Sequence, residues 1–197
     1  TVLFFFPSSI AVYNISLKNQ VKIIDENKFL DIPVTVYGKS KLVCEEVGEE
    51  HAKVNKFFDY RCIRFPGIIS SETMPTGGTS DYASEIIHSA ISGDNYSCFV
   101  DSETILPFIV MPDAISAIIK LMDSPKKHLT INSYNITSFS PSVIDLKNKI
   151  QVFFPNFHLD YYINSKRQKI VNSWPSYIND LLAKKDWGWS PKYNFDN

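Results

Sequence analysis

The chain has 197 residues and a formal net charge of −1, from 20 basic and 21 acidic side chains, and 44% of its residues are hydrophobic. This length and composition are typical of one well-buried globular domain, with or without a small second lobe. The balanced charge gives no electrostatic footprint for nucleic acid or an anionic membrane. No apolar run approaches the roughly 20 residues that span a bilayer, so the expected partners are small molecules or proteins.

Strand and helix alternate in the first part of the chain. The apolar runs at residues 2–6 and 60–65 predict strands buried on both faces. Between them, residues 40–58 carry apolar side chains near helical period and predict a helix. Doubly buried strands joined by helical crossovers form parallel sheets, so we expect an α/β fold.

The elements predicted after residue 65 are shorter and more often interrupted by loops. Residues 104–122 predict a strand that passes at Asp113, as N-cap, into a helix with one apolar face. Ser140 as N-cap and Pro141 at the first helical position predict the start of another helix. The remaining predictions are a loop at 66–79, a helix at about 80–92, strands at 97–100, 133–138 and 157–163, a polar loop at 164–169, and one short helix with an aromatic tail within 173–194.

The spacing of cysteine and histidine indicates neither disulfides nor a metal site. Cys44, Cys62 and Cys98 lie far apart among apolar or helical neighbours, as reduced packing residues do. The four histidines show no paired spacing with one another or with cysteine. We expect a reducing compartment and no bound metal.

The segment "VTVYGKSK", residues 34–41, carries the first candidate for chemistry. Tyr37 and Lys41 lie four residues apart at the start of a predicted helix, so they share one face. A tyrosine titrates near pH 10, and a nearby ammonium lowers its pKa toward the roughly three-unit shift that a base at neutral pH requires. Ser9, at the carboxyl end of the first strand, is placed to hold a substrate oxygen. The alternative is that Tyr37 is a boundary aromatic and Lys41 a solvated charge.

A second candidate is "GGTS", residues 77–80, before the helix predicted at about residue 80. Gly77 and Gly78 let the backbone approach a ligand closely. Thr79 and Ser80 sit at a helix N-terminus, where free amides favour an anion such as a substrate carboxylate. The alternative is that one of these hydroxyls merely caps the helix, and the two roles are compatible.

Three segments together, "PSSIAVY", "VTVYGKSK" and "YRCIRFPGIIS", resemble the catalytic half of the extended short-chain dehydrogenase/reductase family. The resemblance implies a Rossmann fold, NAD as cofactor, and a Ser-Tyr-Lys triad formed by Ser9, Tyr37 and Lys41, with Lys41 also holding the nicotinamide ribose. The residues expected to bind NAD are Pro7, Ser8, Tyr37, Lys41, Phe65, Pro66, Gly67 and Ile68. On this basis residues 1–65 are expected to form the carboxyl-terminal portion of a Rossmann domain, and residues 66–197 a substrate-binding lobe interleaved with the last sheet strands.

Later motifs resemble the short-chain type of NAD-dependent L-threonine 3-dehydrogenases, in order and across essentially the whole chain. These motifs are "GGTSDYASEI", "YNITSFSPSVI", "RQKIVNSWP" and "DWGWSPKYNFD". The resemblance implies oxidation of L-threonine to 2-amino-3-ketobutyrate with Tyr37 as base, and substrate contacts from Ser9, Gly78, Thr79 and Ser80. Ser80 stands where those enzymes have a second threonine. Family members commonly form dimers through helices, one of which matches residues 40–58, so a homodimer is expected.

Two residues in the part that matches the substrate lobe have open roles. Trp174 either covers the pocket and excludes water or packs structurally. Arg167 either pairs with a substrate carboxylate or ties its loop to the lobe. Trp187 and Trp189, in "DWGW", are expected to be packing residues of the terminal lobe, and Asp113 a cap rather than an acid or base.

A glycine-rich phosphate-binding turn is missing from the sequence. NAD-binding Rossmann domains need one between a strand and a helix, and no G-x-G-x-x-G or G-x-x-G-x-x-G occurs among the seven glycines. In the family that turn precedes the matching segment, so we expect a fragment that starts about halfway through the sheet and exposes an apolar strand edge at residues 2–6. Two alternatives stay open, a non-catalytic remnant that binds a full-length relative, and a nucleotide-sugar epimerase or dehydratase. The family resemblance allows a mitochondrial or a cytoplasmic location.

Overall fold

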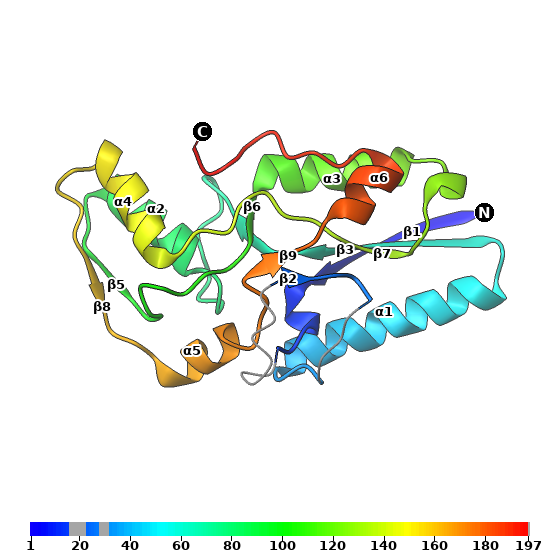
Figure 1. The fold of residues 1–197 in the computed structure, drawn as a ribbon, viewed down its shortest axis with the longest axis horizontal. Coiled ribbons are helices and arrows are strands. Elements are labelled where there is room, and N and C mark those ends of the chain that lie inside the picture. Colours follow the sequence, from blue (N-terminus) through cyan, green and yellow to red (C-terminus); the bar gives the residue numbers. More distant parts are fainter. Residues whose placement is uncertain (16–22, 28–31, 197) are drawn as a thin grey trace.

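A parallel sheet of three strands forms the centre of the computed structural model, which describes residues 1–15, 23–27 and 32–196. The strands lie in the order β1 (Val2–Ser9), β3 (Phe58–Phe65) and β7 (Ser133–Asn135). The register of β1 and β3 runs from Val2 opposite Phe58 to Ser9 opposite Phe65. Figure 1 shows α1 on one face of this sheet and α3 and α6 on the other. The expected α/β fold with a parallel sheet is therefore confirmed.

Helix α1 (Val36–Val54) begins and ends four residues before the limits predicted from periodicity. Its start is set by Thr35, whose Oγ1 accepts a hydrogen bond from the backbone N–H of Gly38 at 2.9 Å. Gly38 and Glu45 are buried on α1. The valines of the helix, by contrast, face solvent, and Val47 and Val54 are 63% and 83% exposed.

The remaining helices surround the sheet and a second group of elements. They are α2 (Tyr82–Ser92), α3 (Met111–Asp123), α4 (Val143–Phe153), α5 (Ser165–Val171) and α6 (Leu181–Trp187), with single 3-10 turns at η1 (Ile10–Val12) and η2 (Lys126–His128). Figure 1 shows α2 and α4 beside β5 and β8 at one end of the molecule, away from α1. The sheet strand β7 comes from the second half of the chain, while the division of the chain at residue 65 stays a prediction.

Three boundary predictions were wrong, because other residues occupy the N-cap positions of these helices. Asp113 lies in the first turn of α3, and its carboxylate accepts the backbone N–H groups of Lys192 and Tyr193 instead of capping the helix. Helix α4 is capped by Ser142, in a reciprocal pair with Asp145, two residues after the predicted Ser140. The predicted polar loop at 164–169 is mostly α5, because the Asn164 side chain accepts the N–H groups of Lys166 and Arg167.

Three pairs of short parallel strands complete the architecture. They are β4 (Gly67–Ile69) with β6 (Phe108–Val110), β5 (Tyr96–Cys98) with β8 (Leu159–Tyr161), and β2 (Ile23–Ile24) with β9 (Tyr177–Ile178). Strand β4 falls inside the loop predicted at 66–79. Its partner β6 lies about 40 residues further along the chain, so no local sequence pattern predicted the pairing of β4 with β6.

Two main hydrophobic clusters stabilise the two ends of the molecule, and a third lies between them. One gathers α2, β5 and α4 around Tyr82 and Leu146. Another joins β3, α3 and the terminal tryptophans, so Trp187 and Trp189 are packing residues as predicted. The third cluster, around Tyr13 and Ile24, has Trp174 against it. Trp174 also packs against the first cluster and so bridges two cores.

The cysteines are all free thiols, but only two of them pack in the interior. Burial raises the pKa of the Cys62 thiol to about 12 and that of the Cys98 thiol to about 11, so both stay protonated at neutral pH. Cys44 lies exposed on α1, which corrects the expectation that it packs inside. Among the residues described, no group of three or more histidine, cysteine, aspartate or glutamate side chains could hold a metal ion.

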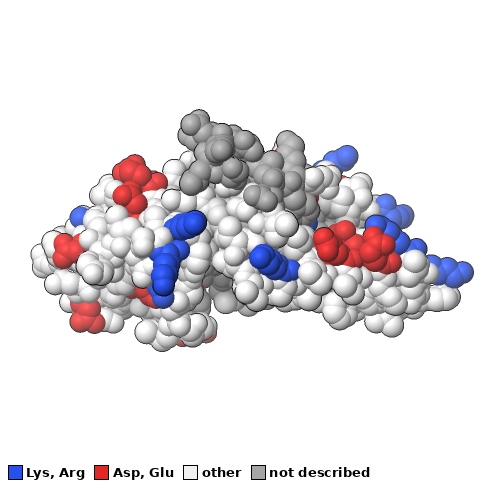
Figure 2. All heavy atoms as spheres, turned by 90° about the horizontal axis from the view of Figure 1, so that it is seen from below, with Lys and Arg blue, Asp and Glu red and all other residues white. Residues whose placement is uncertain are grey.

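The surface carries charges of both signs and one apolar strand edge. On the face in Figure 2, acidic and basic groups are interspersed and no continuous basic area appears between them. No helix in the described part of the chain is long and apolar enough to cross a membrane. Strand β1 is an outer strand of the sheet, and Val2, Leu3 and Phe4 on it are 41–63% exposed, as expected for residues 2–6.

Candidate active site

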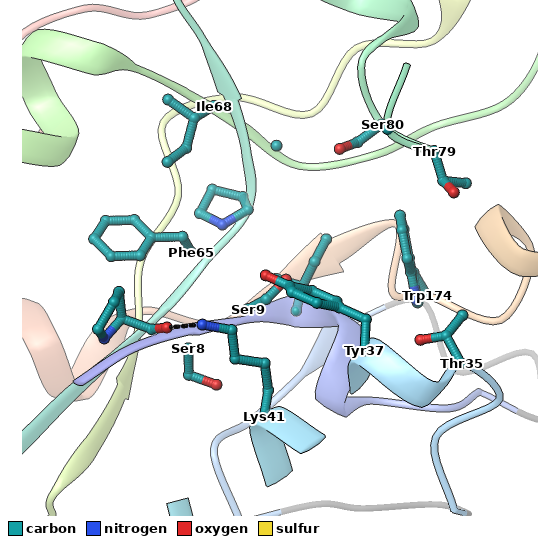
Figure 3. A pocket seen from close by; sticks show the side chains of 15 residues that line it. Ser8, Ser9, Thr35, Tyr37, Lys41, Phe65, Ile68, Thr79, Ser80 and Trp174 are labelled. Atoms are coloured by element: carbon teal, nitrogen blue, oxygen red, sulfur yellow. Dashed lines mark hydrogen bonds between the residues drawn. The ribbon is translucent and has the colours of Figure 1, made fainter. Parts of the chain in front are cut away.

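A pocket of about 510 Å³ opens where β1 and β3 end, at the carboxyl edge of the parallel sheet. This is the edge at which ligands collect in α/β folds. Apart from Arg167, all residues predicted for the site line this pocket, together with Ile10 and Thr35 (Figure 3). The lining residues are Pro7, Ser8, Ser9, Ile10, Thr35, Tyr37, Lys41, Phe65, Pro66, Gly67, Ile68, Gly78, Thr79, Ser80 and Trp174.

Tyr37 and Lys41 lie together on α1, as their spacing predicted. The Lys41 Nζ is 5.6 Å from the centroid of the Tyr37 ring and 4.8 Å from that of Phe6. It donates a hydrogen bond of 2.5 Å to the carbonyl oxygen of Pro7, at the end of β1. The ammonium is thus held beside the Tyr37 ring by the carbonyl oxygen near the end of β1.

Ser9 lies beside Tyr37 in the pocket (Figure 3). Its Oγ accepts a hydrogen bond from the backbone N–H of Ala11 at 3.2 Å, and this contact caps the η1 turn. A hydroxyl that accepts one bond still has its own O–H to donate. Ser9 can therefore donate to an oxygen held in front of Tyr37.

A close approach between α1 and η1 places Tyr37 and Ser9 on the lining of the same pocket. A Cβ added at Gly38 would lie only 2.1 Å from the carbonyl oxygen of Ala11, a distance that real atoms do not adopt. Only glycine therefore permits this packing. The glycine in "YGKSK" is therefore required by the packing around the site. The spacing of residues in the sequence did not predict this requirement.

The wall made by β1 and the turn after β3 contains an unpartnered hydroxyl. Ser8 is 3% exposed, and its Oγ has no hydrogen-bond partner among the described residues. Phe65, Pro66, Gly67 and Ile68 continue this wall. The pocket thus offers a buried polar atom and an apolar surface side by side, which suits one end of a planar, partly polar ring.

The opposite wall is the loop before α2, and here the capping prediction was wrong. Asp81, rather than Thr79 or Ser80, occupies the N-cap position of α2, and its side chain does not cap the helix. The Asp81 carboxylate accepts the backbone N–H groups of Gly78 at 2.7 Å and Thr76 at 3.1 Å. The Gly78 amide is therefore already bonded to an anion, and Thr79 and Ser80 offer the pocket their hydroxyls.

Arg167 does not line the pocket. Its guanidinium donates a hydrogen bond of 3.0 Å to the carbonyl oxygen of Gly77 and lies 4.2 Å from the centroid of the Phe99 ring. Of the two roles left open by the sequence, the structure shows the second, a tie between the glycine loop and α5. Trp174, in contrast, does line the pocket, and its indole nitrogen has no partner within the described ranges.

A buried ionic group behind the pocket was not predicted. The Arg64 guanidinium, on β3, makes bonds of 2.6–3.1 Å to both carboxylate oxygens of Glu45 on α1. It also donates to the Tyr13 hydroxyl and to the carbonyl oxygen of Glu26, each within 2.8 Å. Burial raises the pKa of Tyr13 to about 12, so that hydroxyl stays neutral. The only sequence signal was a pair of arginines inside an otherwise apolar strand.

Comparison with known proteins agrees with this geometry. The sequence model of the NAD dependent epimerase/dehydratase family matches residues 1–137. An uncharacterized epimerase/dehydratase of Staphylococcus aureus is 40% identical over 195 residues, 97% of this chain and 59% of that protein. The mitochondrial L-threonine 3-dehydrogenase of Sus scrofa is 36% identical over 164 residues, 83% of this chain and 43% of that protein.

Solved structures give the same result for the fold. A monomeric L-threonine 3-dehydrogenase from a metagenome, in its apo form, superposes with a TM-score of 0.90 at 40% identity, covering 97% of this chain and 60% of that one. The chain thus spans about three fifths of the length of the relatives that it matches over nearly all its residues. Together, the family match and these identities place the chain in the NAD-dependent epimerase/dehydratase family.

Proposed function

We propose that this site belongs to an NAD-dependent L-threonine 3-dehydrogenase, which oxidises the side-chain hydroxyl of L-threonine and forms 2-amino-3-ketobutyrate. The observation that carries the proposal is a single pocket in which Ser9, Tyr37 and Lys41 face Thr79 and Ser80 (Figure 3). Relatives that carry this name, at 36–40% identity, support the choice of substrate.

Each residue of the triad has a distinct task in this proposal. Ser9 donates a hydrogen bond to the reacting hydroxyl oxygen and orients it toward Tyr37. The phenolate oxygen of Tyr37 accepts the proton of that hydroxyl. Lys41, held by the Pro7 carbonyl, stabilises the phenolate by its charge. The hydroxyls of Thr79 and Ser80 hold the amino acid end of the substrate at the opposite wall.

NAD is the cofactor of the family, and the pocket fits the nicotinamide end of it. When bound, NAD⁺ supplies the hydride acceptor. The residues that would hold its ring and ribose are Pro7, Ser8, Tyr37, Lys41, Phe65, Pro66, Gly67 and Ile68, and the unpartnered Ser8 hydroxyl supports this assignment. The glycine-rich turn that would hold the pyrophosphate is not part of this sequence.

The test of this function is NADH formation, followed by absorbance, when the chain is mixed with NAD⁺ and L-threonine. We expect NADH to form only when both NAD⁺ and L-threonine are present. A parallel heat-denaturation series compares L-threonine with a nucleotide sugar, and protection by L-threonine is expected because Thr79 and Ser80 line the same pocket as Tyr37. Protection by the nucleotide sugar alone would contradict the proposed substrate.

A further inference from the structure

A second cavity, of about 240 Å³, adjoins the candidate active site at Trp174. Ile105 and Val171 give it an apolar wall, and Glu103, Thr104, Asn172 and Ser176 a polar one. Trp174 lines both this cavity and the 510 Å³ pocket that contains Tyr37. The indole is therefore the one side chain, among the described residues that line either space, that the two have in common.

The position of Trp174 is fixed by its backbone and by packing on both sides. Its N–H donates a hydrogen bond of 3.0 Å to the carbonyl oxygen of Val171, at the end of α5. Its ring packs against the core cluster around Tyr82 and against that around Tyr13. A large ring held in this way is a fixed wall, and its removal would leave space rather than collapse.

The indole N–H of Trp174 makes no hydrogen bond to the described residues. It is buried and, within the described residues, has no hydrogen-bond partner, although an indole N–H is a donor that usually finds one when buried. Packing in the core accounts for the ring but leaves this N–H without a partner.

We propose that Trp174 determines substrate length at this site. Its indole closes the pocket toward the second cavity and limits the substrate to a 2-amino-3-hydroxy acid with a short alkyl group on carbon 3. Without the indole, the cavity beyond it takes a longer alkyl chain against Ile105 and Val171. This inference rests on the proposed function for the class of substrate, but the position of the indole on the lining of both cavities does not depend on it.

The experiment compares a short and a long ligand in three proteins, namely the wild type, Trp174→Ala and Trp174→Phe. L-threonine and its six-carbon analogue, L-threo-2-amino-3-hydroxyhexanoate, are titrated while the backbone amide NMR signals of Thr79 and Ser80 are followed. Trp174→Ala is expected to raise the affinity for the long ligand relative to the short one by about tenfold or more, as pockets discriminate single methylenes by such factors. Trp174→Phe keeps an aromatic ring and is expected to retain most of the wild-type preference.

An unchanged ratio of the two affinities in a folded Trp174→Ala variant would overturn the proposal. If that variant does not fold, Trp174→Leu, which leaves a smaller void, takes its place in the same comparison. If neither amino acid binds the wild type, the proposed substrate is wrong, and 2-butanol and 2-hexanol replace them as probes of the passage alone. In Trp174→Ala, the affinity for 2-hexanol relative to 2-butanol is then expected to rise by the same factor of about ten. If none of these ligands changes the NMR signals, the proposal is rejected.

Discussion

At the scale of single residues, the proposed reaction depends most directly on the phenol of Tyr37. We predict that Tyr37→Phe lowers turnover at least a hundredfold, because general-base catalysis contributes about 10²–10⁴ and phenylalanine cannot accept the proton. Cofactor affinity should fall far less than turnover, because phenylalanine keeps the aromatic ring that lines the pocket. NADH formation and NAD⁺ titration measure both quantities. Tyr162→Phe is the matched control, since Tyr162 is 82% exposed and does not line the pocket. Near-normal turnover in Tyr37→Phe would exclude Tyr37 as the base.

Gly38 is the residue that allows α1 to pack closely against η1. We predict that Gly38→Ala destabilises the protein by about 1–3 kcal/mol, because its Cβ would collide with the Ala11 carbonyl and force α1 away from η1. Denaturant unfolding monitored by circular dichroism measures the difference. Lys39→Ala, at the next and exposed position of the helix, should change the free energy of unfolding by less than about 0.5 kcal/mol. Equal effects of the two substitutions would refute the argument from close approach.

At the scale of elements, α1 is joined to β3 by the buried pair of Glu45 and Arg64. We predict that Glu45→Gln costs about 3–5 kcal/mol, because it leaves the Arg64 guanidinium buried without its counter-charge. On the same helix, Glu50→Gln removes an exposed pair with Lys53 and should leave the free energy of unfolding nearly unchanged. Urea unfolding of the two variants makes the comparison. A small effect of Glu45→Gln would mean that the pair does not stabilise this packing.

The turn after β2 places a second carboxyl, that of Glu26, in the interior. Burial raises the pKa of Glu26 above its ordinary value of 4.5, so the folded state binds this proton more tightly than the unfolded state. The stabilisation from this group is complete below pH 4.5 and is lost as the pH rises through the higher folded pKa. Glu26→Gln should therefore be more stabilising, relative to the wild type, at pH 7 than at pH 4.5. A difference in unfolding free energy that does not vary with pH would contradict this.

At the scale of the whole molecule, two apolar surfaces are open to a partner, the edge of β1 and the valines of α1. We expect a homodimer through α1, because Val43, Val47 and Val54 form an exposed stripe at 54–83% exposure. Val47→Lys should shift the chain to monomer in sedimentation equilibrium. Phe4→Lys, on the β1 edge, leaves this stripe intact and measures the contribution of the edge to association separately. A monodisperse wild-type monomer would reject both the dimer and the expectation that the exposed edge of β1 makes the chain associate.

The sequence by itself determined the features that depend on neighbouring residues. Continuous apolar runs predicted β1 and β3, and the four-residue spacing of Tyr37 and Lys41 placed both on one face of α1 because helical geometry is local. Resemblance of short motifs supplied the family and the pocket residues on β1, on the turn after β3 and before α2. The sequence predictions were wrong at two helix caps, where Asp113 and Ser140 were chosen over alternatives of equal local preference, in the loop that contains β4, and at the exposed Cys44.

Only the tertiary structure decided which distant groups satisfy one another. Arg167 donates to the Gly77 carbonyl oxygen, and the charge of Arg64 is balanced by Glu45, and residue spacing predicts neither pair. Trp174 was visible in the sequence, but its place between two cavities was not. The physical reason is that a cap, a salt bridge or a cavity depends on which polar or bulky side chains lie next to one another after packing. Those neighbours are set by the whole fold.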